Sequence, residues 1–236
     1  MIKTKRKVRI FIYIIVLLVT IFSYYSKDSF GKVNDSNSNI SLDNIPEYNG
    51  SLYVSINNNK PYFKDSDLVS NSYEKYSKLD NLGRAGVAIA NIGKNLMPSE
   101  ERKGIGMIKP SGWHTIKYDF IDGKYLYNRC HLIGYQLTGE NANPKNLITC
   151  TRSMNTKGML PFENMVADYI KESGNHVLYR VTPIYKDDNL LASGVLIEAE
   201  SVEDKGSGIL FNVYVYNNED GVTIDYKTGD SERSWK

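Results

Sequence analysis

The segment "LYNRCHLIGYQL", residues 126–137, interrupts an apolar run with an amide, a guanidinium, a thiol and an imidazole: Asn128, Arg129, Cys130 and His131. Histidine is the side chain best suited to act as a general base near neutral pH. A base alone does little to a phosphodiester, because the transition state gathers negative charge on the phosphoryl oxygens. A divalent cation or a cluster of arginines is needed beside it.

Asn155 and Glu163 offer oxygen atoms for such a cation. A hard cation such as Mg²⁺ prefers oxygen ligands and keeps most of its waters, so one or two protein oxygens suffice. On an α-helix, residues eight apart lie on nearly the same face, two turns from each other. We therefore expect the carboxamide of Asn155 and the carboxylate of Glu163 to address one hydrated ion, directly or through its waters.

A hairpin, a loop and a helix are predicted to hold these groups. Within residues 112–137, Asp122-Gly123 separates two runs of alternating polarity, which is a strong hairpin signal. The stretch that ends at His131 is therefore predicted to be the second hairpin arm. Residues 138–158 are rich in Asn, Gly and Thr and indicate a loop.

Residues 161–174 carry a helical pattern. Gly174 suits a C-terminal cap, and Pro161 suits the first turn or, if the helix begins earlier, a kink. The apolar positions that recur at helical spacing are Phe162, Met165, Val166, Tyr169 and Ile170. Strand-like runs fill most of the remaining chain, at residues 51–63, 85–93, 176–185, 190–201, 208–217 and 221–229. The pattern predicts an α+β domain with a central, mostly antiparallel sheet and flanking helices.

The N-terminal part differs from the rest of the chain. A basic run precedes the apolar residues 10–22, which is the layout of a signal peptide or a signal anchor and directs the following chain out of the cytoplasm. The apolar run is short for a spanning helix and long for a cleaved signal, so we favour a retained anchor over residues 1–25. Residues 26–44 are rich in Ser, Asn and Asp and are predicted to be a disordered tether. Residues 45–236 then form the folded domain.

Charge is unevenly distributed along the chain. Residues 75–157 carry thirteen basic and six acidic side chains, a net charge of +7, whereas residues 158–236 carry seven basic and fourteen acidic ones, a net charge of −7. A basic region in an otherwise acidic domain suggests a polyanionic partner that meets only this part of the protein. A chance fluctuation in surface charge is the alternative.

The two cysteines, Cys130 and Cys150, leave two alternatives open. In an exported domain they could form one disulfide, and two free thiols packed in a core are equally compatible with the sequence. The chain shows neither zinc-ligand spacing nor a glycine-rich phosphate loop. His114 and His176 lie in strand patterns without a neighbouring set of ligands, so we expect them to be structural or exposed.

Residues 127–164, "YNRCHLIGYQLTGENANPKNLITCTRSMNTKGMLPFEN", resemble the metal-dependent, non-specific DNA/RNA endonucleases of the ββα-metal fold. The signature of that family is Asp-Arg-Gly-His, followed by an Asn on a helix and a nearby Glu. The resemblance is closest to membrane-bound DNA-entry nucleases and secreted bacterial DNases, and it extends over roughly residues 50–230. It implies a ββα-metal core within the α+β domain.

The resemblance also implies a role for each matching residue. His131 would deprotonate the attacking water, and Asn155 would be the direct protein ligand of Mg²⁺, with Mn²⁺ as the alternative metal. Glu163 would hold a metal-bound water, and Arg129 would contact phosphate or brace the loop. The products would carry 5′-phosphates.

Two positions of the motif depart from the family. Asn128 replaces the Asp and brings no negative charge, and Cys130 replaces the Gly. Outside the motif, Arg84 could direct an unpaired guanidinium towards the transition state, and Asn146 could support the site. The remaining cations near the motif are candidate phosphate contacts or merely solvated charges: Lys145, Arg152 and Lys157.

The sequence thus predicts an exported, Mg²⁺-dependent endonuclease that acts on DNA and on RNA with little sequence preference. It would be tethered to the membrane by its N-terminal segment or secreted after cleavage. One alternative is a non-catalytic nucleic-acid-binding module at the cell surface, which needs the basic region but not His131. A Cys-dependent hydrolase is disfavoured, because Cys130 and His131 are adjacent and side chains of adjacent strand residues point to opposite faces.

Overall fold

The computed structural model describes residues 45–234 of the 236-residue chain. The predicted anchor over residues 1–25 and the predicted tether over residues 26–44 lie outside the described residues. Within residues 45–234, no helix has both the length and the apolar character needed to cross a bilayer.

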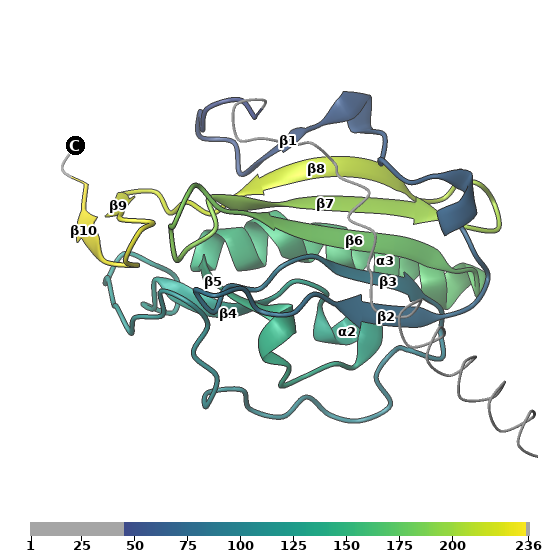
Figure 1. Ribbon diagram of the computed structural model, residues 1–236, viewed down its shortest axis with the longest axis horizontal. Coiled ribbons are helices and arrows are strands. Elements are labelled where there is room, and N and C mark those ends of the chain that lie inside the picture. The colour runs from purple at the N-terminus through teal and green to yellow at the C-terminus, as the bar shows by residue number, and fades with distance from the viewer. Residues whose placement is uncertain (1–44, 235–236) are drawn as a thin grey trace, which may run out of the picture. The chain divides into compact units, whose positions relative to one another are not determined.

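A six-stranded antiparallel sheet forms the centre of the domain, with the strand order β1-β8-β7-β6-β3-β2 (Figure 1). Every pair of neighbours in it is antiparallel, which confirms the predicted mostly antiparallel α+β class. Its strands are β1 (Tyr53–Ser55), β2 (Tyr73–Tyr76), β3 (Ala88–Ile92), β6 (Val177–Ile184), β7 (Gly194–Ser201) and β8 (Leu210–Tyr216).

Helix α3 (Leu160–Ser173) covers one face of this sheet (Figure 1). Alternate residues of the strands pack against the helix in one core cluster, as the two-residue period of a strand requires. Met165, predicted on the apolar stripe, is 50% exposed, whereas Glu163 and Ala167 are buried. The buried stripe of the helix is therefore rotated relative to the predicted one, and Glu163 lies within it.

The opposite face of the sheet is covered by the N-terminal part of the domain. There Glu198 and Arg180 form a buried ion pair with an Nε–Oε2 distance of 2.6 Å. The backbone N–H of Tyr62 donates a second bond to Glu198 at 2.8 Å, and the ring of Phe63 stacks on the Arg180 guanidinium. These contacts attach the segment that precedes β2 to the sheet and satisfy both buried charges.

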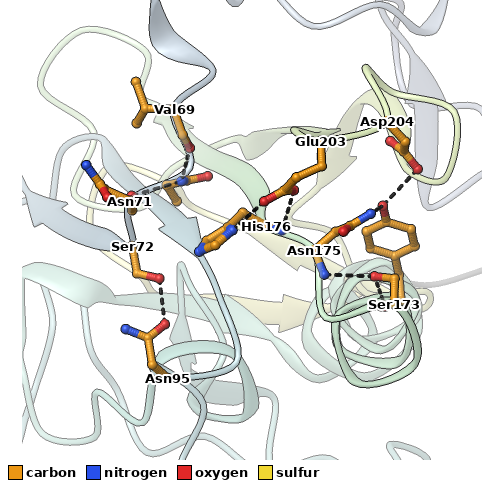
Figure 2. Close-up of polar contacts among 11 residues, drawn as sticks. Val69, Asn71, Ser72, Asn95, Ser173, Asn175, His176, Glu203 and Asp204 are labelled. Atoms are coloured by element: carbon orange, nitrogen blue, oxygen red, sulfur yellow. Dashed lines mark hydrogen bonds and ion pairs between the residues drawn. The ribbon is translucent and has the colours of Figure 1, made fainter.

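A polar network joins the end of α3 to the turn between β7 and β8. Gly174 ends the helix at φ +76°, as predicted. Beyond it, the amide of Asn175 donates to the hydroxyl of Tyr169, which in turn donates to Asp204, and His176 lies beside Glu203 (Figure 2). The backbone N–H and the Nδ1 atom of His176 both bond to the Glu203 carboxylate at 2.7 Å. His176 therefore has a structural partner, as expected.

The strands of the ββα unit differ from the predicted hairpin arms. β4 (Tyr127–His131) pairs antiparallel with β5 (Leu147–Thr151) as a separate two-stranded sheet, and the connection between them contains α2 (Tyr135–Thr138). A turn does form at Asp122-Gly123, but it is flanked by a single bridge between Lys117 and Tyr125. The prediction of a loop over residues 138–158 was wrong from Leu147 onward, because the short apolar run of β5 stands among Asn and Thr and becomes a strand only by pairing with β4.

The C-terminal part of the domain packs against that turn. Strands β9 (Val222–Ile224) and β10 (Ser231–Arg233) form a small hairpin. Val222 belongs to a second apolar cluster with Ile121, Leu126, Tyr127 and Leu191. This cluster includes Tyr127, the first residue of β4.

Candidate active site

β4 and β5 hold the residues of the His131 motif in a fixed register. His131 lies opposite Leu147, and Asn128 lies opposite Cys150. Cys130 and Cys150 form a disulfide between the two strands, with a Cα–Cα distance of 5.9 Å. Of the two alternatives that the sequence left open, the structure therefore has the disulfide. Both cysteines are fully buried, so neither offers the free thiol that a Cys-dependent hydrolase needs, and that hypothesis is wrong.

The helix that follows β5 begins earlier than predicted. Met154–Met159 form a π-helical turn that leads directly into α3, and the N–H of Leu160 bonds to the carbonyl of Asn155, five residues back. Pro161 lacks the N–H that a regular α-helix would use at this point. π-turns within helices occur often at functional sites. Asn155 and Glu163 are thus not in the regular-helix phase that their spacing implied.

The imidazole of His131 has one committed and one available nitrogen. Its Nε2 lies 2.7 Å from the carbonyl oxygen of Asn141, which can only accept, so Nε2 carries the hydrogen. Its Nδ1 lies 3.3 Å from the Arg102 guanidinium, which can only donate, so Nδ1 holds the lone pair. Burial lowers the pKa of His131 from 6.5 to about 4. The bond to the Asn141 carbonyl acts against this shift, and the positive charge of Arg102 acts in the same direction as burial. The ring is therefore neutral near pH 7.

Arg102 was not predicted as a site residue. It lies 29 positions before His131 in an exposed loop, and nothing in the spacing of that loop singles it out. The loop is held in place by Tyr135, whose hydroxyl donates to the carbonyl of Glu100 at 2.7 Å, and by Asn141, whose amide donates to the carbonyl of Lys103 at 3.1 Å. The only sequence signal for Arg102 is its position within the basic region.

An open cavity of about 530 Å³ adjoins Arg102. Of the predicted site residues, Asn155, Asn128, Arg129 and Arg152 line it. Its other lining residues are Arg102, Ile105, Trp113, Thr115, Tyr125 and Tyr127. His131 is not among the lining residues, but its Nδ1 lies 3.3 Å from the guanidinium of Arg102, which does line the cavity. The cavity thus combines two carboxamides, three guanidinium groups and aromatic surface, which suits an anionic ligand with planar bases.

Glu163 is buried and is not among the residues that line the cavity. It is 9% exposed, and its carboxylate packs against Gly134, where a Cβ atom would collide with it. Burial raises the pKa of Glu163 to about 7, although Gln136 and the positive charge of Arg102 act in the opposite direction. Arg102 is therefore close enough to influence both His131 and Glu163.

Arg129 and Asn146 support the loops around the site. The guanidinium of Arg129 bonds to the carbonyls of Ile108 and Gly106 and stacks on Trp113, 3.8 Å from the ring centroid. Asn146 is fully buried, and its carboxamide bonds to both the N–H and the C=O of Ile133. Arg129 therefore braces a loop that lines the cavity, one of the two roles expected for it.

Arg84 does not present the unpaired guanidinium that was predicted. Its Nε pairs with Asp80 at 2.7 Å, and its NH1 donates to the carbonyls of Asp187 and Asn189. It is also absent from the lining of the cavity. Arg84 precedes a strand, as predicted, but the loop at residues 186–189 captures it. No local pattern around Arg84 indicates this tertiary contact.

The other candidate phosphate contacts are at the surface. Lys145 and Lys157 are exposed, and Arg152 lines the cavity while pairing with Asp122 at 3.0 Å. His114 is also exposed and bonds to the carbonyl of Thr228.

The donor set fits a hydrated hard cation better than a closed metal cage. Among residues 45–234, no cluster of three or more His, Cys, Asp or Glu side chains could enclose an ion. Asn155 and Asn128 instead offer carboxamide oxygens on the wall of an open cavity. A hard cation that keeps most of its waters needs only one or two such oxygens.

The chain is similar to proteins described as nucleases. The pattern of the family described as DNA/RNA non-specific endonuclease matches residues 64–203. NucA from Streptococcus agalactiae with a magnesium ion bound has a TM-score of 0.68 and 26% sequence identity, over 76% of this chain and 87% of that one. The same nuclease without metal has a TM-score of 0.71 and 25% identity, over 85% and 99%. Sda1 nuclease with a bound zinc ion has a TM-score of 0.64 and 27% identity, over 78% and 97%.

Proposed function

The chain belongs to the DNA/RNA non-specific endonuclease family, and on that premise we propose that it hydrolyses DNA and RNA outside the cytoplasm with His131 as general base and Asn155 as metal ligand. Membership of this family makes the protein an endonuclease, so a non-catalytic binding module is no longer an alternative. The proposal concerns how this chain performs the reaction and where.

The observation that carries the proposal is the fixed tautomer of His131. Its Nε2–H is committed to the Asn141 carbonyl, so only Nδ1 can accept a proton from a water that attacks phosphorus. The same carbonyl then stabilises the imidazolium that forms. Approach of an anionic phosphate favours that imidazolium, so it raises the pKa of His131 above its value in the free protein.

Arg102 is proposed to bind the scissile phosphate. In the free protein its guanidinium faces Nδ1, the atom that the attacking water must reach. A phosphate in the cavity attracts the guanidinium away from Nδ1, and the positive charge then lies beside the non-bridging oxygens, where negative charge grows in the transition state. The loop arginine thus exposes the base and stabilises the phosphate in one movement.

Asn155 is proposed to hold Mg²⁺, with Mn²⁺ as the alternative. Glu163 is proposed to hold a metal-bound water. When bound, the ion would supply positive charge to the phosphate and to the leaving oxygen. In-line attack with departure of the 3′ oxygen leaves 5′-phosphate ends. This metal assignment is supported by the carboxamides on the cavity wall and by the magnesium ion in NucA.

Low sequence preference and export are parts of the same proposal. The net charge of +7 over residues 75–157 favours binding through phosphates, which carry no base sequence. The disulfide suits an oxidising compartment, and the N-terminal basic and apolar segments suit export.

Nicking of supercoiled plasmid by the purified protein tests the proposal. We expect cleavage with Mg²⁺, none with excess chelator, and a loss of more than about 100-fold for His131→Ala, the scale of losing a general base. Matched DNA and RNA substrates report the sugar preference, and phosphatase-sensitive 5′ labelling reports the ends. Near-wild-type nicking by His131→Ala would refute the mechanism.

A further inference from the structure

Glu219 bonds to the start of the helix that carries Asn155. Its two carboxylate oxygens accept hydrogen bonds from the backbone N–H of Ser153, at 2.8 Å, and from the Ser153 hydroxyl, at 2.6 Å. Glu219 is 8% exposed and Ser153 is 7% exposed. A carboxylate at a helix N-terminus satisfies an N–H that has no partner within the helix and interacts favourably with the helix dipole.

Asn217, two residues earlier, holds the end of β5. Its Oδ1 accepts the N–H of Thr151 at 2.8 Å, and its Nδ2 donates to the carbonyl of Thr149 at 3.2 Å. The Thr151 hydroxyl donates to the carbonyl of Asn218 at 2.8 Å and accepts the N–H of Met154 at 3.1 Å. The corner between β5 and the helix is therefore held by one short turn, residues 217–219, which we call the corner clamp.

The corner clamp is itself fixed from the other side. The amide of Asn217 donates a further bond to the carbonyl of Ala192 at 2.9 Å, and its backbone N–H bonds to the carbonyl of Ser193 at 2.9 Å. The hydroxyl of Tyr226 donates to the carbonyl of Asn217 at 2.6 Å. The clamp follows the region matched by the family pattern, which ends at residue 203.

The direction of the Asn155 side chain depends on this corner. Asn155 is two residues after Ser153, inside the π-helical turn, where the helix widens and the backbone is less constrained by the regular α-helical pattern. The side chain direction in a helix follows the backbone. We propose that Glu219, assisted by Asn217, is a positioning residue that fixes the carboxamide of Asn155 for the metal. The inference rests on the proposed function, in which Asn155 is the metal ligand.

Direct binding of Mn²⁺ to the full chain, followed by electron paramagnetic resonance, tests this role without depending on activity. We expect Glu219→Ala to raise the Mn²⁺ dissociation constant by about 10- to 100-fold, the usual effect of removing a group that orients a ligand. Glu219→Gln keeps an oxygen for the Ser153 N–H, so a smaller rise is expected. Activity of Glu219→Ala should recover as the Mn²⁺ concentration is increased.

Glu198 provides the matched control for a merely structural effect. It is also a buried glutamate with two hydrogen-bonded oxygens, but it lies on the opposite face of the sheet, paired with Arg180. Glu198→Gln should lower the melting temperature while leaving Mn²⁺ affinity unchanged. Equal Mn²⁺ affinities of wild type and Glu219→Ala, or an equal loss in Glu198→Gln, would overturn the inference.

Two further variants keep the test decisive. If Glu219→Ala does not fold, Ser153→Ala takes its place, because it removes the shorter bond and keeps the backbone one; an unchanged dissociation constant would then overturn the inference. Asn155→Ala distinguishes failure of the proposed metal ligand from failure of the positioning role of Glu219. If it binds Mn²⁺ as wild type does, the proposed metal ligand and the inference both fail, whereas loss of binding there with normal binding by Glu219→Ala removes only the inference.

Discussion

The guanidinium of Arg102 lies 3.3 Å from Nδ1 of His131, although 29 residues separate the two in the chain. The other imidazole nitrogen is committed to the Asn141 carbonyl, so the cation sits at the one basic atom of the ring. In the proposed reaction the imidazole of His131 accepts a proton, and the guanidinium of Arg102 pairs with an anion. A phosphate entering between them would satisfy both.

Replacing Arg102 by Ala is predicted to reduce kcat/KM for plasmid cleavage by about 100-fold, the scale of losing one preorganised donor to a developing negative charge. Its charge also contributes to the lowered pKa of His131, after the larger effect of burial. The acid limb of the pH profile of kcat/KM should therefore move to higher pH in Arg102→Ala. Arg102→Lys keeps the charge and should leave the acid limb nearly in place.

Arg84→Ala is the control for this prediction, because Arg84 bonds to Asp80 and to the carbonyls of Asp187 and Asn189 instead of facing the cavity. It should lower the melting temperature and leave the pH profile unchanged. A wild-type pH profile in Arg102→Ala, or a shifted one in Arg84→Ala, would contradict the assignment of the two arginines.

The stability of the domain should depend on pH through His131. Burial lowers the pKa of His131 from 6.5 to about 4, so the unfolded chain binds a proton at a higher pH than the folded one. The contribution of the neutral His131 to the free energy of unfolding is fully present above about pH 6.5. It is lost as the pH falls towards 4, with a total of about 3 kcal/mol. Urea unfolding of wild type and His131→Gln, with chelator present, measures it.

The difference in unfolding free energy between these two proteins is expected to shift by about 3 kcal/mol between pH 7.5 and pH 4, in the direction of a relatively less stable wild type in acid. All other titrating groups are shared by the two proteins and cancel. A difference that does not change with pH would mean that the imidazole is as easily protonated in the folded protein as in the unfolded one.

Local patterns in the sequence identified most of the fold. Strand-like runs identified β6, β7 and β8, and Gly174 marked the end of α3. The pairing of β4 with β5 was missed, because a five-residue strand among Asn and Thr has no periodic signal of its own. Its register is set by the partner strand and by the disulfide, which are tertiary facts.

The residues of the candidate site likewise fall into those that the sequence identified and those that it did not. His131 and Asn155 could be named as candidates, since both sit in the segment that resembles the family motif. Arg102, which bonds to His131, and Glu219, which bonds to Ser153, could not, because no local pattern encodes these contacts between distant parts of the chain. Arg84 is the opposite case. Its position near a strand end made it a candidate, but in the structure its guanidinium bonds to the loop at residues 186–189.

Removing the disulfide should lower the free energy of unfolding of the domain and leave catalysis by the folded protein in place. Cys130 and Cys150 close a segment with a sequence separation of 20, and such a crosslink stabilises by about 3 kcal/mol in the chain-entropy account. The Cys130→Ala, Cys150→Ala double variant should lose about that much in urea unfolding and keep metal-dependent nicking below its melting temperature. Thiol alkylation of the oxidised wild type should leave nicking intact. Inactivation by the alkylating reagent would revive a role for a free thiol.

Glu163→Gln should make the domain more stable and less active. Burial raises the pKa of Glu163 from 4.5 to about 7, against the opposing effects of Gln136 and Arg102, so the unfolded chain releases this proton first as the pH rises. The charged carboxylate therefore costs stability above pH 4.5, and the cost is complete above pH 7, at up to about 3 kcal/mol. Glutamine has a similar shape and no charge, so it should remove that cost.

With chelator present, urea unfolding at pH 8 should find Glu163→Gln more stable than wild type, and the two should converge near pH 4. Nicking with Mg²⁺ should fall in the same variant, because the proposed site loses the negative charge of the Glu163 carboxylate. Retaining an acid that destabilises the fold makes physical sense if the metal site needs its charge. A variant that is more stable and fully active would instead leave Glu163 outside the chemistry, and one that is less stable at every pH would show that its carboxylate serves the fold alone.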